Sequence, residues 1–283
     1  MRWLFVLFAC VLSAEERPFV VLKAHEIGMF GAFNQVLALV KLYDRGLYRG
    51  MEVDFGKKGL YYDPAHGDNW WTYYCDPISV GEREGVLEVS GDVPYARRRE
   101  AEWYTMPEEA FSLIEKYIHF KPHILEKVRA FEEAHFRDHV VIGVHYRGTD
   151  KLESEASKVY PFDVFRHVQQ LVRQLLMDRI KYKIFVASDE QRMVDMMKSM
   201  FSTHFCCQEK ALRAVKGRPP PHFDRFYDRY LCGEEALIDC LLLSKCDLLV
   251  RTSSNLSLWA TYLNPTMPVT ELNQRIDDEK PVD

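Results

Sequence analysis

The first half of the chain predicts a strand, a loop, a helix and a second strand in succession. Residues 19–23 form a short apolar run, and residues 51–55 alternate between apolar and polar positions, as strands do. Residues 32–45 carry apolar side chains at the three- and four-residue spacing of a helix. The loop before this helix contains Gly28 and Gly31, which let a backbone approach a ligand at a helix start, although a tight turn is their commoner use.

The second half predicts a parallel sheet, because its apolar runs are continuous rather than alternating. Helical segments separate these runs in the strand–helix order of an α/β fold. Ser188 or Asp189 is the expected cap of the helix that follows the second run. We expect strands over residues 139–146, 183–187, 247–250 and 269–272, and helices over 161–177, from 188–190 to about 200, over 233–244 and from 252–255 onward.

Polar side chains with useful chemistry follow three of these predicted strands. Ligands of open parallel sheets bind beyond the carboxyl ends of the strands, so these side chains are expected at one edge. An arginine there favours an anionic ligand, because guanidinium binds phosphate or carboxylate through two hydrogen bonds. Hydroxyls and amides at a helix start also hold phosphate, with simple capping or a solvated loop as the alternatives. The side chains are His145, Arg147, Asp150, Lys151, Asp189, Ser253 and Ser254.

Asp239 is placed among apolar residues in the middle of the helix predicted over 233–244. A buried carboxylate without a partner is costly, so it either pairs with a nearby cation or accepts hydrogen bonds from a ligand, such as the two donors of a guanine edge. Both interpretations stay open. The aromatic-dense segment 68–77 is favoured as core packing over a stacking platform for a sugar or base.

Composition and motifs exclude several classes of protein. The 283 residues, 47% of them apolar, suffice for one large α/β domain or two small ones. We place a domain boundary near residues 135–138, after a helical stretch over 107–134, which gives domains over 15–137 and 138–283. The net charge of −5 without a long basic run gives nucleic-acid binding no support. The chain has no P-loop, no Asp-x-Asp pair, no nucleophile elbow and no close CxxC, so we expect no bound metal.

The N-terminus predicts export. Arg2, an apolar stretch over 3–12 and the small residues Ser13 and Ala14 form a signal peptide over 1–14, with a buried first strand as the alternative. This stretch is too short to span a bilayer, and we expect no stable membrane span. Export places the protein in the secretory-pathway lumen or, in a bacterium, the periplasm or outside the cell. Six cysteines remain after cleavage, which permits disulfides of unspecified pairing.

Residues 144–151 resemble the HxRxTDK signature of GDP-fucose-dependent fucosyltransferases. The likeness is nearest to the core and Nod-factor fucosyltransferases and more distant to the protein O-fucosyltransferases. The blocks at 185–190 and 229–254 are similar in order and spacing to the family's acid-ending strand and nucleotide-binding block. The glycine loop at 28–35 is similar to the family's N-terminal one. The resemblance is specific over 139–155 and 183–260 and loose elsewhere.

The resemblance implies a GT-B fold, in which two Rossmann-like domains face each other across a cleft. It implies inverting, metal-independent transfer of fucose from GDP-fucose, without a cofactor, to a glycan or glycoprotein acceptor. Glu155 is implied as the general base with Lys151 as its partner, and a solvated loop glutamate is the alternative. The implied donor site comprises Arg147 on the β-phosphate, His145 and Asp239 on guanosine, Ser253 and Ser254 on the phosphates, and Asp150, Asp189, Gly28 and Gly31 around them.

The chain departs from the family pattern at Gly148, where the core enzymes tend to carry a second arginine. This sequence is also shorter than the core enzymes and shows no obvious coiled-coil stem or SH3-like tail, so a core N-glycan acceptor is not implied and the acceptor stays open. The sequon Asn255-Leu256-Ser257 falls inside the implied site and is expected to be unmodified. The alternatives are a glycosyltransferase of the same fold with another nucleotide-sugar donor, a non-catalytic exported sugar- or nucleotide-binding protein, and, third, a hydrolase.

Overall fold

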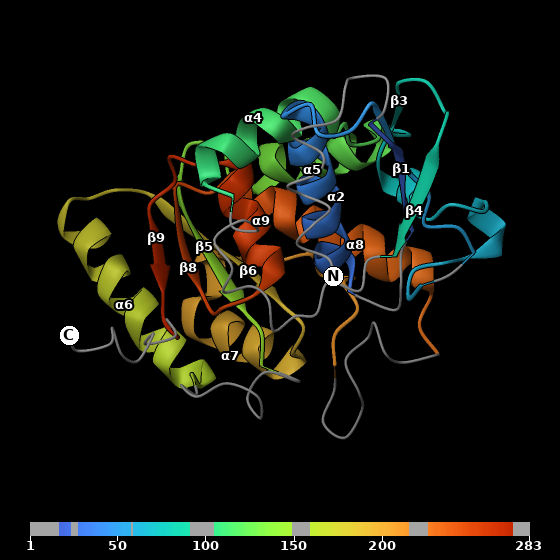
Figure 1. The fold of residues 1–283 in the computed structure, drawn as a ribbon. Coiled ribbons are helices and arrows are strands. Elements are labelled where there is room, and N and C mark those ends of the chain that lie inside the picture. Colours follow the sequence, from blue (N-terminus) through green and yellow to red (C-terminus); the bar gives the residue numbers. More distant parts are fainter. Residues whose placement is uncertain are drawn as a thin grey trace, which may run out of the picture. The chain divides into compact units, whose positions relative to one another are not determined.

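The structure is a computed structural model that describes residues 17–23, 28–57, 59–90, 105–148, 159–214 and 226–273. The chain divides into two compact units, Met1–Pro122 and His123–Asp283, each with a sheet of its own (Figure 1). The limits expected from the sequence, 15–137 and 138–283, assign residues 123–137 to the other side of the division, and they stay a prediction of domain organisation.

The first unit contains a four-stranded sheet in the order β3-β2-β1-β4. Strand β1 pairs in parallel with both β2 and β4, and β3 joins the edge antiparallel to β2. The strand–helix–strand prediction is confirmed, but the helix begins before Gly31, which lies in its first turn, and Gly28 is the residue that precedes it. The elements are β1 (Phe19–Lys23), α2 (Met29–Asp44), β2 (Gly50–Val53), α3 (Trp71–Tyr74), β3 (Ser79–Val80), β4 (Val86–Ser90) and α4 (Pro107–Tyr117).

The aromatic segment after β2 is part of the core of this unit. The side chains of Trp70 and Trp71 are completely buried. The ring of Trp71 lies 5.0 Å from that of Phe33 on α2, and the ring of Trp70 lies 4.7 Å from that of Phe55. The indole of Trp71 donates a hydrogen bond to the carbonyl of Asp76 (2.9 Å). Core packing is therefore the correct interpretation, and these two rings are not free to stack on a ligand.

Replacing Trp71 by alanine should lower the free energy of unfolding by about 3–5 kcal/mol, because the change removes a fully buried ring and leaves a cavity. Urea unfolding measures the loss. Met106, which is 57% exposed at the start of α4, provides the control, and M106A should cost less than about 0.5 kcal/mol. Equal losses in the two variants would contradict this description of the core.

The second unit contains a five-stranded sheet in the order β7-β6-β5-β8-β9, and every pair in it is parallel. This confirms the parallel sheet expected from the continuous apolar runs. Helices α6 and α7 lie on one face of the sheet and α8 and α9 on the other (Figure 1). The elements are α5 (Pro122–His135), β5 (Val140–Tyr146), α6 (Pro161–Met177), β6 (Tyr182–Ser188), α7 (Gln191–Phe201), β7 (Phe205–Cys206), α8 (Arg229–Ser244), β8 (Leu248–Arg251), α9 (Asn255–Leu263) and β9 (Val269–Glu271).

Successive residues of β5 point to opposite faces of this sheet. Val144 and Tyr146 pack in one buried cluster with side chains of α6 and α7. Gly143 faces α8 so closely that a Cβ atom there would lie 2.9 Å from the Sγ of Cys246. The alternation therefore places His145 on the α8 face, which decides its neighbours in the site.

Two details of the helix starts differ from expectation. Neither Ser188 nor Asp189 caps α7, because the residue before this helix is Glu190, whose amide donates to the Ser188 hydroxyl (3.1 Å). Helix α8 begins at Arg229, four residues earlier than expected, because the Asp228 carboxylate accepts a hydrogen bond from the amide of Leu231 (2.9 Å) and caps it.

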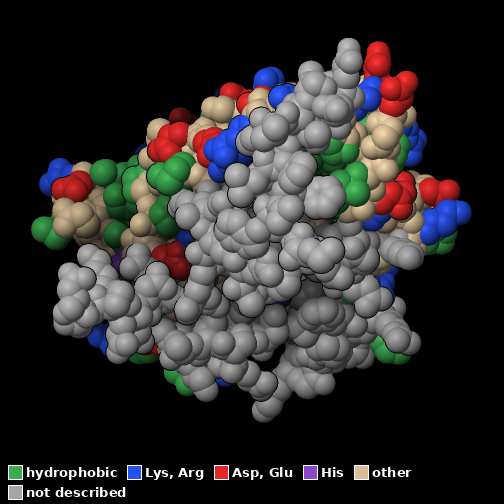
Figure 2. All heavy atoms as spheres, viewed as in Figure 1, with side chains coloured by type: hydrophobic (Ala, Val, Ile, Leu, Met, Phe, Trp, Pro, Cys, Tyr) green, Lys and Arg blue, Asp and Glu red, His purple; other side chains and the backbone are tan. Residues whose placement is uncertain are grey.

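The surface in Figure 2 carries basic and acidic side chains of the described residues interspersed rather than in a field of one sign. The six cysteines from Cys75 to Cys246 are free thiols. Among the helices of the described ranges, none combines the length and apolar character needed to cross a membrane. The signal peptide predicted over 1–14 lies outside the described residues.

Candidate functional site

The candidate site lies at the carboxyl ends of β5, β6 and β8, three adjacent parallel strands. Their register places Tyr146 opposite Ser188 and His145 opposite Arg251. The residues that follow each strand therefore emerge at one edge of the sheet, where parallel α/β folds bind ligands. This is the gathering of polar groups expected from the sequence.

Arg147 connects the ends of all three strands. Its amide donates a hydrogen bond to the hydroxyl of Thr252, after β8, at 2.9 Å. Its guanidinium Nε lies 3.7 Å from the carboxylate of Asp189, after β6. The same carboxylate accepts a hydrogen bond from the amide of Gly148 (3.3 Å). Asp189 thus orients both the guanidinium and the backbone of residues 147–148, which begin the segment after β5 and are called the motif loop below. The side chains of Arg147 and Asp189 are largely buried.

His145 is a neutral histidine beneath this edge. It is 4% exposed, and its ring Nδ1 has no hydrogen-bond partner among the described residues. Burial, together with the positive charges of Arg147 and Arg251, lowers the pKa of His145 to about 3. A neutral imidazole with a free ring nitrogen can donate or accept one hydrogen bond, depending on its tautomer.

The loop after β8 is held by buried polar contacts. The hydroxyl of Ser257 donates toward the carbonyls of Thr252 and Ser254, each at 3.2 Å. The amide of Ser253 donates to the side chain of Asn273 (2.6 Å). Ser254 caps α9 by accepting from the amide of Leu256 (3.3 Å), as the capping alternative expected. The loop conformation is therefore fixed, and phosphate contacts by Ser253 and Ser254 stay a prediction.

Arg251 is a largely buried cation that was not predicted as a site residue from the sequence. It ion-pairs with Glu271, and its guanidinium lies 3.5 Å from the hydroxyl of Ser257. The alternation of β8 carries the signal, because Arg251 follows Leu249 on the face that His145 occupies in the next strand. Asn273 gave no such signal, since its contact depends on how the chain returns after β9.

Asp239 accepts a hydrogen bond from the side-chain amide of Gln208 at 2.6 Å, so its hydrogen-bond donor is an amide rather than a cation. Burial raises the pKa of Asp239 to about 7, while Gln208 and the nearby Arg213 partly oppose that shift. Arg213 is itself buried and donates to the Gln208 carbonyl (2.6 Å). The segment with Gln208 and Arg213 ends at Ala214, whose amide donates to the Asp189 carbonyl (2.7 Å). Backbone pairing thus ties this segment to the strand ends.

Three predicted site residues, Asp150, Lys151 and Glu155, lie outside the described residues. Gly28 and Gly31 belong to the first unit, where Gly28 begins α2 and its carbonyl accepts from the amide of Ala32 (3.1 Å). The structure brings together His145, Arg147, Asp189 and the loop of Ser253 and Ser254 through the register of three strands.

The family model for the N- and catalytic domains of alpha-(1,6)-fucosyltransferase matches residues 112–258, just over half of the chain. The match includes the strand ends and the loop of the candidate site. The chain belongs to the alpha-(1,6)-fucosyltransferase family. This confirms the resemblance inferred from the sequence and makes the protein a glycosyltransferase.

Solved fucosyltransferases share the fold of this family member. The NodZ fucosyltransferase from Bradyrhizobium matches with a TM-score of 0.58 and 15% identity, over 91% of this chain and 96% of that one. NodZ alpha-1,6-fucosyltransferase soaked with GDP-fucose matches with a TM-score of 0.56 and 16% identity, over 88% and 94%. POFUT1 in complex with GDP matches with a TM-score of 0.50 and 12% identity, over 91% and 99%. These matches confirm the α/β, GT-B fold class.

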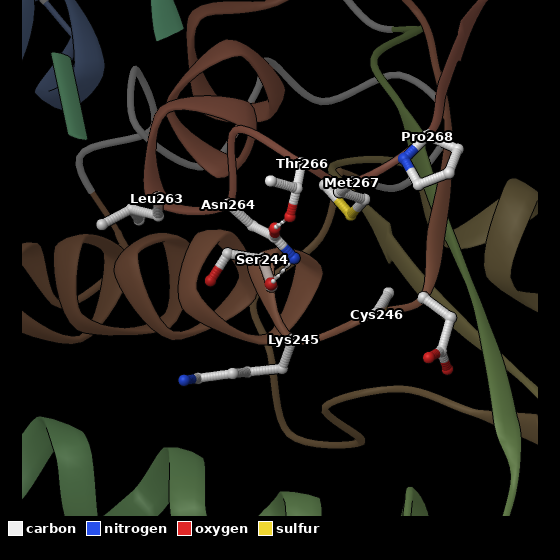
Figure 3. A pocket seen from close by; sticks show the side chains of 9 residues that line it. Ser244, Lys245, Cys246, Leu263, Asn264, Thr266, Met267 and Pro268 are labelled. Atoms are coloured by element: carbon white, nitrogen blue, oxygen red, sulfur yellow. Dashed lines mark hydrogen bonds between the residues drawn. The ribbon is translucent and has the colours of Figure 1, made fainter. Parts of the chain in front are cut away.

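A polar hollow of about 400 Å³ lies at the opposite edge of the fucosyltransferase sheet, where β8 and β9 begin (Figure 3). Asn264 crosses it and donates to the carbonyl of Ser244 (2.9 Å), and Thr266 donates to Asn264 (3.1 Å). The hollow is lined by residues 244–247, 263–264 and 266–268, which are remote in the strand register from Arg147 and His145. It is therefore not part of the candidate site.

The described ranges of the fucosyltransferase contain no group of three His, Cys, Asp or Glu side chains that could hold a metal ion. Residues 149–158 and 215–225, which carry further acids and histidine, are outside these ranges. Metal independence accordingly stays a prediction.

The free energy of unfolding should depend on pH in opposite directions in the variants Asp239→Asn and His145→Gln. Because the pKa of His145 is lowered to about 3, unfolding binds a proton between about pH 3 and 6.5, and stability rises with pH there. Because the pKa of Asp239 is raised to about 7 from 3.8, unfolding releases a proton in its window, and stability falls with rising pH. From pH 4 to 6.5 the two contributions nearly cancel in the unmodified protein. Relative to it, Asp239→Asn should gain stability with rising pH and His145→Gln should lose stability, each by about 1 kcal/mol per pH unit.

Urea unfolding at a series of pH values measures these slopes. The exposed His119 supplies the control, and His119→Gln should follow the unmodified protein at every pH. Parallel slopes in Asp239→Asn, His145→Gln and the unmodified protein would show that neither group is buried as described.

Proposed function

We propose that this fucosyltransferase transfers fucose from GDP-fucose to a hydroxyl of a glycan or glycoprotein, with inversion and without a metal ion. The observation that carries the proposal is Arg147, a largely buried guanidinium oriented by Asp189 at the carboxyl ends of parallel strands. Solved relatives of the same fold contain GDP or were soaked with GDP-fucose, which supports a guanosine diphosphate donor.

Arg147 is proposed to bind the β-phosphate of the donor. Its guanidinium offers two parallel donors to a phosphate, and a site of reduced polarity strengthens their attraction. Negative charge accumulates on the diphosphate as the sugar leaves, so a cation held in place before the reaction stabilises the transition state more than the bound substrate. The hydroxyls of Ser253 and Ser254 are proposed to assist at the phosphates.

His145 and Asp239 are proposed to contact guanosine. The neutral imidazole offers a single hydrogen bond suited to an uncharged group. An ionised carboxylate accepts both adjacent N–H donors of the guanine edge, and the hydrogen bond from Gln208 leaves lone pairs of Asp239 available. A guanine is therefore expected to be preferred to a uracil, whose edge presents a single N–H donor between two carbonyls.

Glu155 is proposed as the general base, with Lys151 near it. The carboxylate takes the proton of the acceptor hydroxyl as its oxygen bonds to the sugar carbon from the face opposite the diphosphate. The bond from that carbon to the leaving oxygen breaks at the same time, and its electron pair departs with GDP. These events account for inversion in a single displacement.

The proposed export also implies a compartment for the reaction. A signal peptide over 1–14 delivers the enzyme to a lumen or periplasm, where glycans and glycoproteins are assembled. GDP-fucose must be present in the same compartment, which favours a secretory-pathway lumen.

Thermal unfolding with added nucleotide tests the donor class. GDP should raise the unfolding midpoint without added metal, because a ligand at 100 times its Kd contributes about 2.7 kcal/mol of stability. UDP at the same concentration is the control and should give a much smaller shift. No shift with millimolar GDP, or an equal shift with UDP, would refute the donor assignment.

A further inference from the structure

Glu190 carries a partly exposed carboxylate at the edge of the candidate site, where Asp189 and Arg192 are charged neighbours. Its backbone is held on both sides, by a bridge to Ala214 and by the start of α7. The residue is only partly exposed, so its carboxylate is partly removed from water. Burial and the neighbouring charge of Asp189 raise the pKa of Glu190, and the positive charge of Arg192 only partly opposes that shift.

The position of this carboxylate is defined by Gly148. A Cβ atom at position 148 would lie 2.5 Å from the Oε1 of Glu190 and 2.4 Å from the ring of Tyr146. Tyr146 is completely buried in the core and has no room to move, so any side chain at 148 would displace the glutamate. Glycine therefore keeps the Glu190 carboxylate against the backbone of the motif loop.

The Glu190 carboxylate thus lies against Gly148, which directly follows Arg147 in the sequence. Arg147 is the residue proposed to bind the β-phosphate. The sugar of a nucleotide-sugar donor is bonded directly to that phosphate, so its hydroxyls are the donor groups next in line. A carboxylate accepts hydrogen bonds from hydroxyls and is acceptor-only when ionised. Hydroxyl donors would offset the unfavourable environment of the free carboxylate, because charge-assisted hydrogen bonds stabilise the ionised form.

We propose that Glu190 is a specificity-determining residue that binds hydroxyl groups of the donor sugar, and that Gly148 is present to admit its carboxylate. The inference rests on the proposed function and adds to it a contact to the sugar instead of the nucleotide. Asp189 does not share this role, because it is engaged with the Arg147 guanidinium and the Gly148 amide.

Calorimetric titration of GDP and of GDP-fucose into the full chain tests the proposal. The ratio of the two Kd values isolates the contribution of the sugar. Glu190→Ala should weaken GDP-fucose binding by about tenfold, the effect of one charge-assisted hydrogen bond, and leave GDP binding within about twofold. Glu190→Gln should weaken GDP-fucose binding by less than Glu190→Ala does, because the amide oxygen still accepts a hydrogen bond. Gly148→Ala should weaken GDP-fucose binding as much as Glu190→Ala does. Glu133→Ala, an exposed glutamate on α5, is the matched control and should change neither constant.

The possible outcomes distinguish failure of the proposed donor function from failure of the proposed role of Glu190. If GDP does not bind the unmodified protein, the proposed function fails. If GDP binds and the ratio in Glu190→Ala equals that of the unmodified protein, the role of Glu190 is refuted. A parallel loss for GDP and GDP-fucose would likewise refute it, since a residue that only holds Arg147 in place affects both ligands. Should Glu190→Ala fail to fold, the isosteric Glu190→Gln decides by the same ratio.

Discussion

Replacing Arg147 by alanine should weaken GDP binding by about 100-fold or more and remove the thermal shift. The guanidinium is the cation proposed to bind the diphosphate, and its removal also takes a positive charge away from the largely buried Asp189 carboxylate. Arg147→Lys should recover only part of the affinity, because an ammonium group cannot make the paired hydrogen bonds of a guanidinium. Calorimetry with GDP at fixed ionic strength measures both variants.

Arg173, an exposed arginine on α6, supplies the control for the change of net charge. Arg173→Ala should bind GDP as the unmodified protein does. If Arg147→Ala also binds GDP with unchanged affinity, the candidate site is not where the diphosphate binds.

Replacing Glu155 by glutamine should preserve GDP-fucose binding and reduce transfer by about 10²- to 10⁴-fold, the usual contribution of a general base. Glutamine keeps the size and the hydrogen-bonding capacity of the side chain but cannot take up the proton. Release of GDP in the presence of acceptor measures transfer, and calorimetry measures binding. Glu153→Gln, two residues earlier in the sequence, should be close to fully active. Full activity of Glu155→Gln would assign the base elsewhere.

The central strands of the second unit could be predicted from the sequence because they are buried on both faces. A continuous apolar run such as that of β5 leaves no competing interpretation of comparable strength. Strands β3 and β4 were not predicted, because they are short or half-exposed and Val86 and Leu87 of β4 face solvent in large part. Their pairing with β1 and β2 depends on tertiary contacts, which a local sequence pattern does not reveal.

The edge of the sheet where the site lies could be predicted for the same reason. Once the strands are parallel, the residues after β5, β6 and β8 must emerge together, so His145, Arg147 and Asp189 were found from the strand ends alone. The side-chain partners could not be found in this way. Gln208 and Asn273 reach the site by return segments whose course depends on packing.

Gly148 departs from the family's sequence pattern, and the structure gives a reason for this departure. The sequence marks it as the absence of an arginine found in the core enzymes. The structure gives a steric reason, because the Glu190 carboxylate and the Tyr146 ring occupy the space that a side chain would need. A loss of positive charge on the motif loop is thus accompanied by a carboxylate held at the same point.

A donor screen is the most direct test of the central claim. The unmodified protein is incubated with GDP-fucose, GDP-mannose and UDP-sugars in the presence of a chelator, on a glycan array that supplies the acceptors, and released nucleotide and labelled glycan are measured. We expect transfer from GDP-fucose and much slower or no transfer from the other donors. Equal or greater transfer from a UDP-sugar, or no transfer from GDP-fucose to any glycan by a protein that binds GDP, would contradict it.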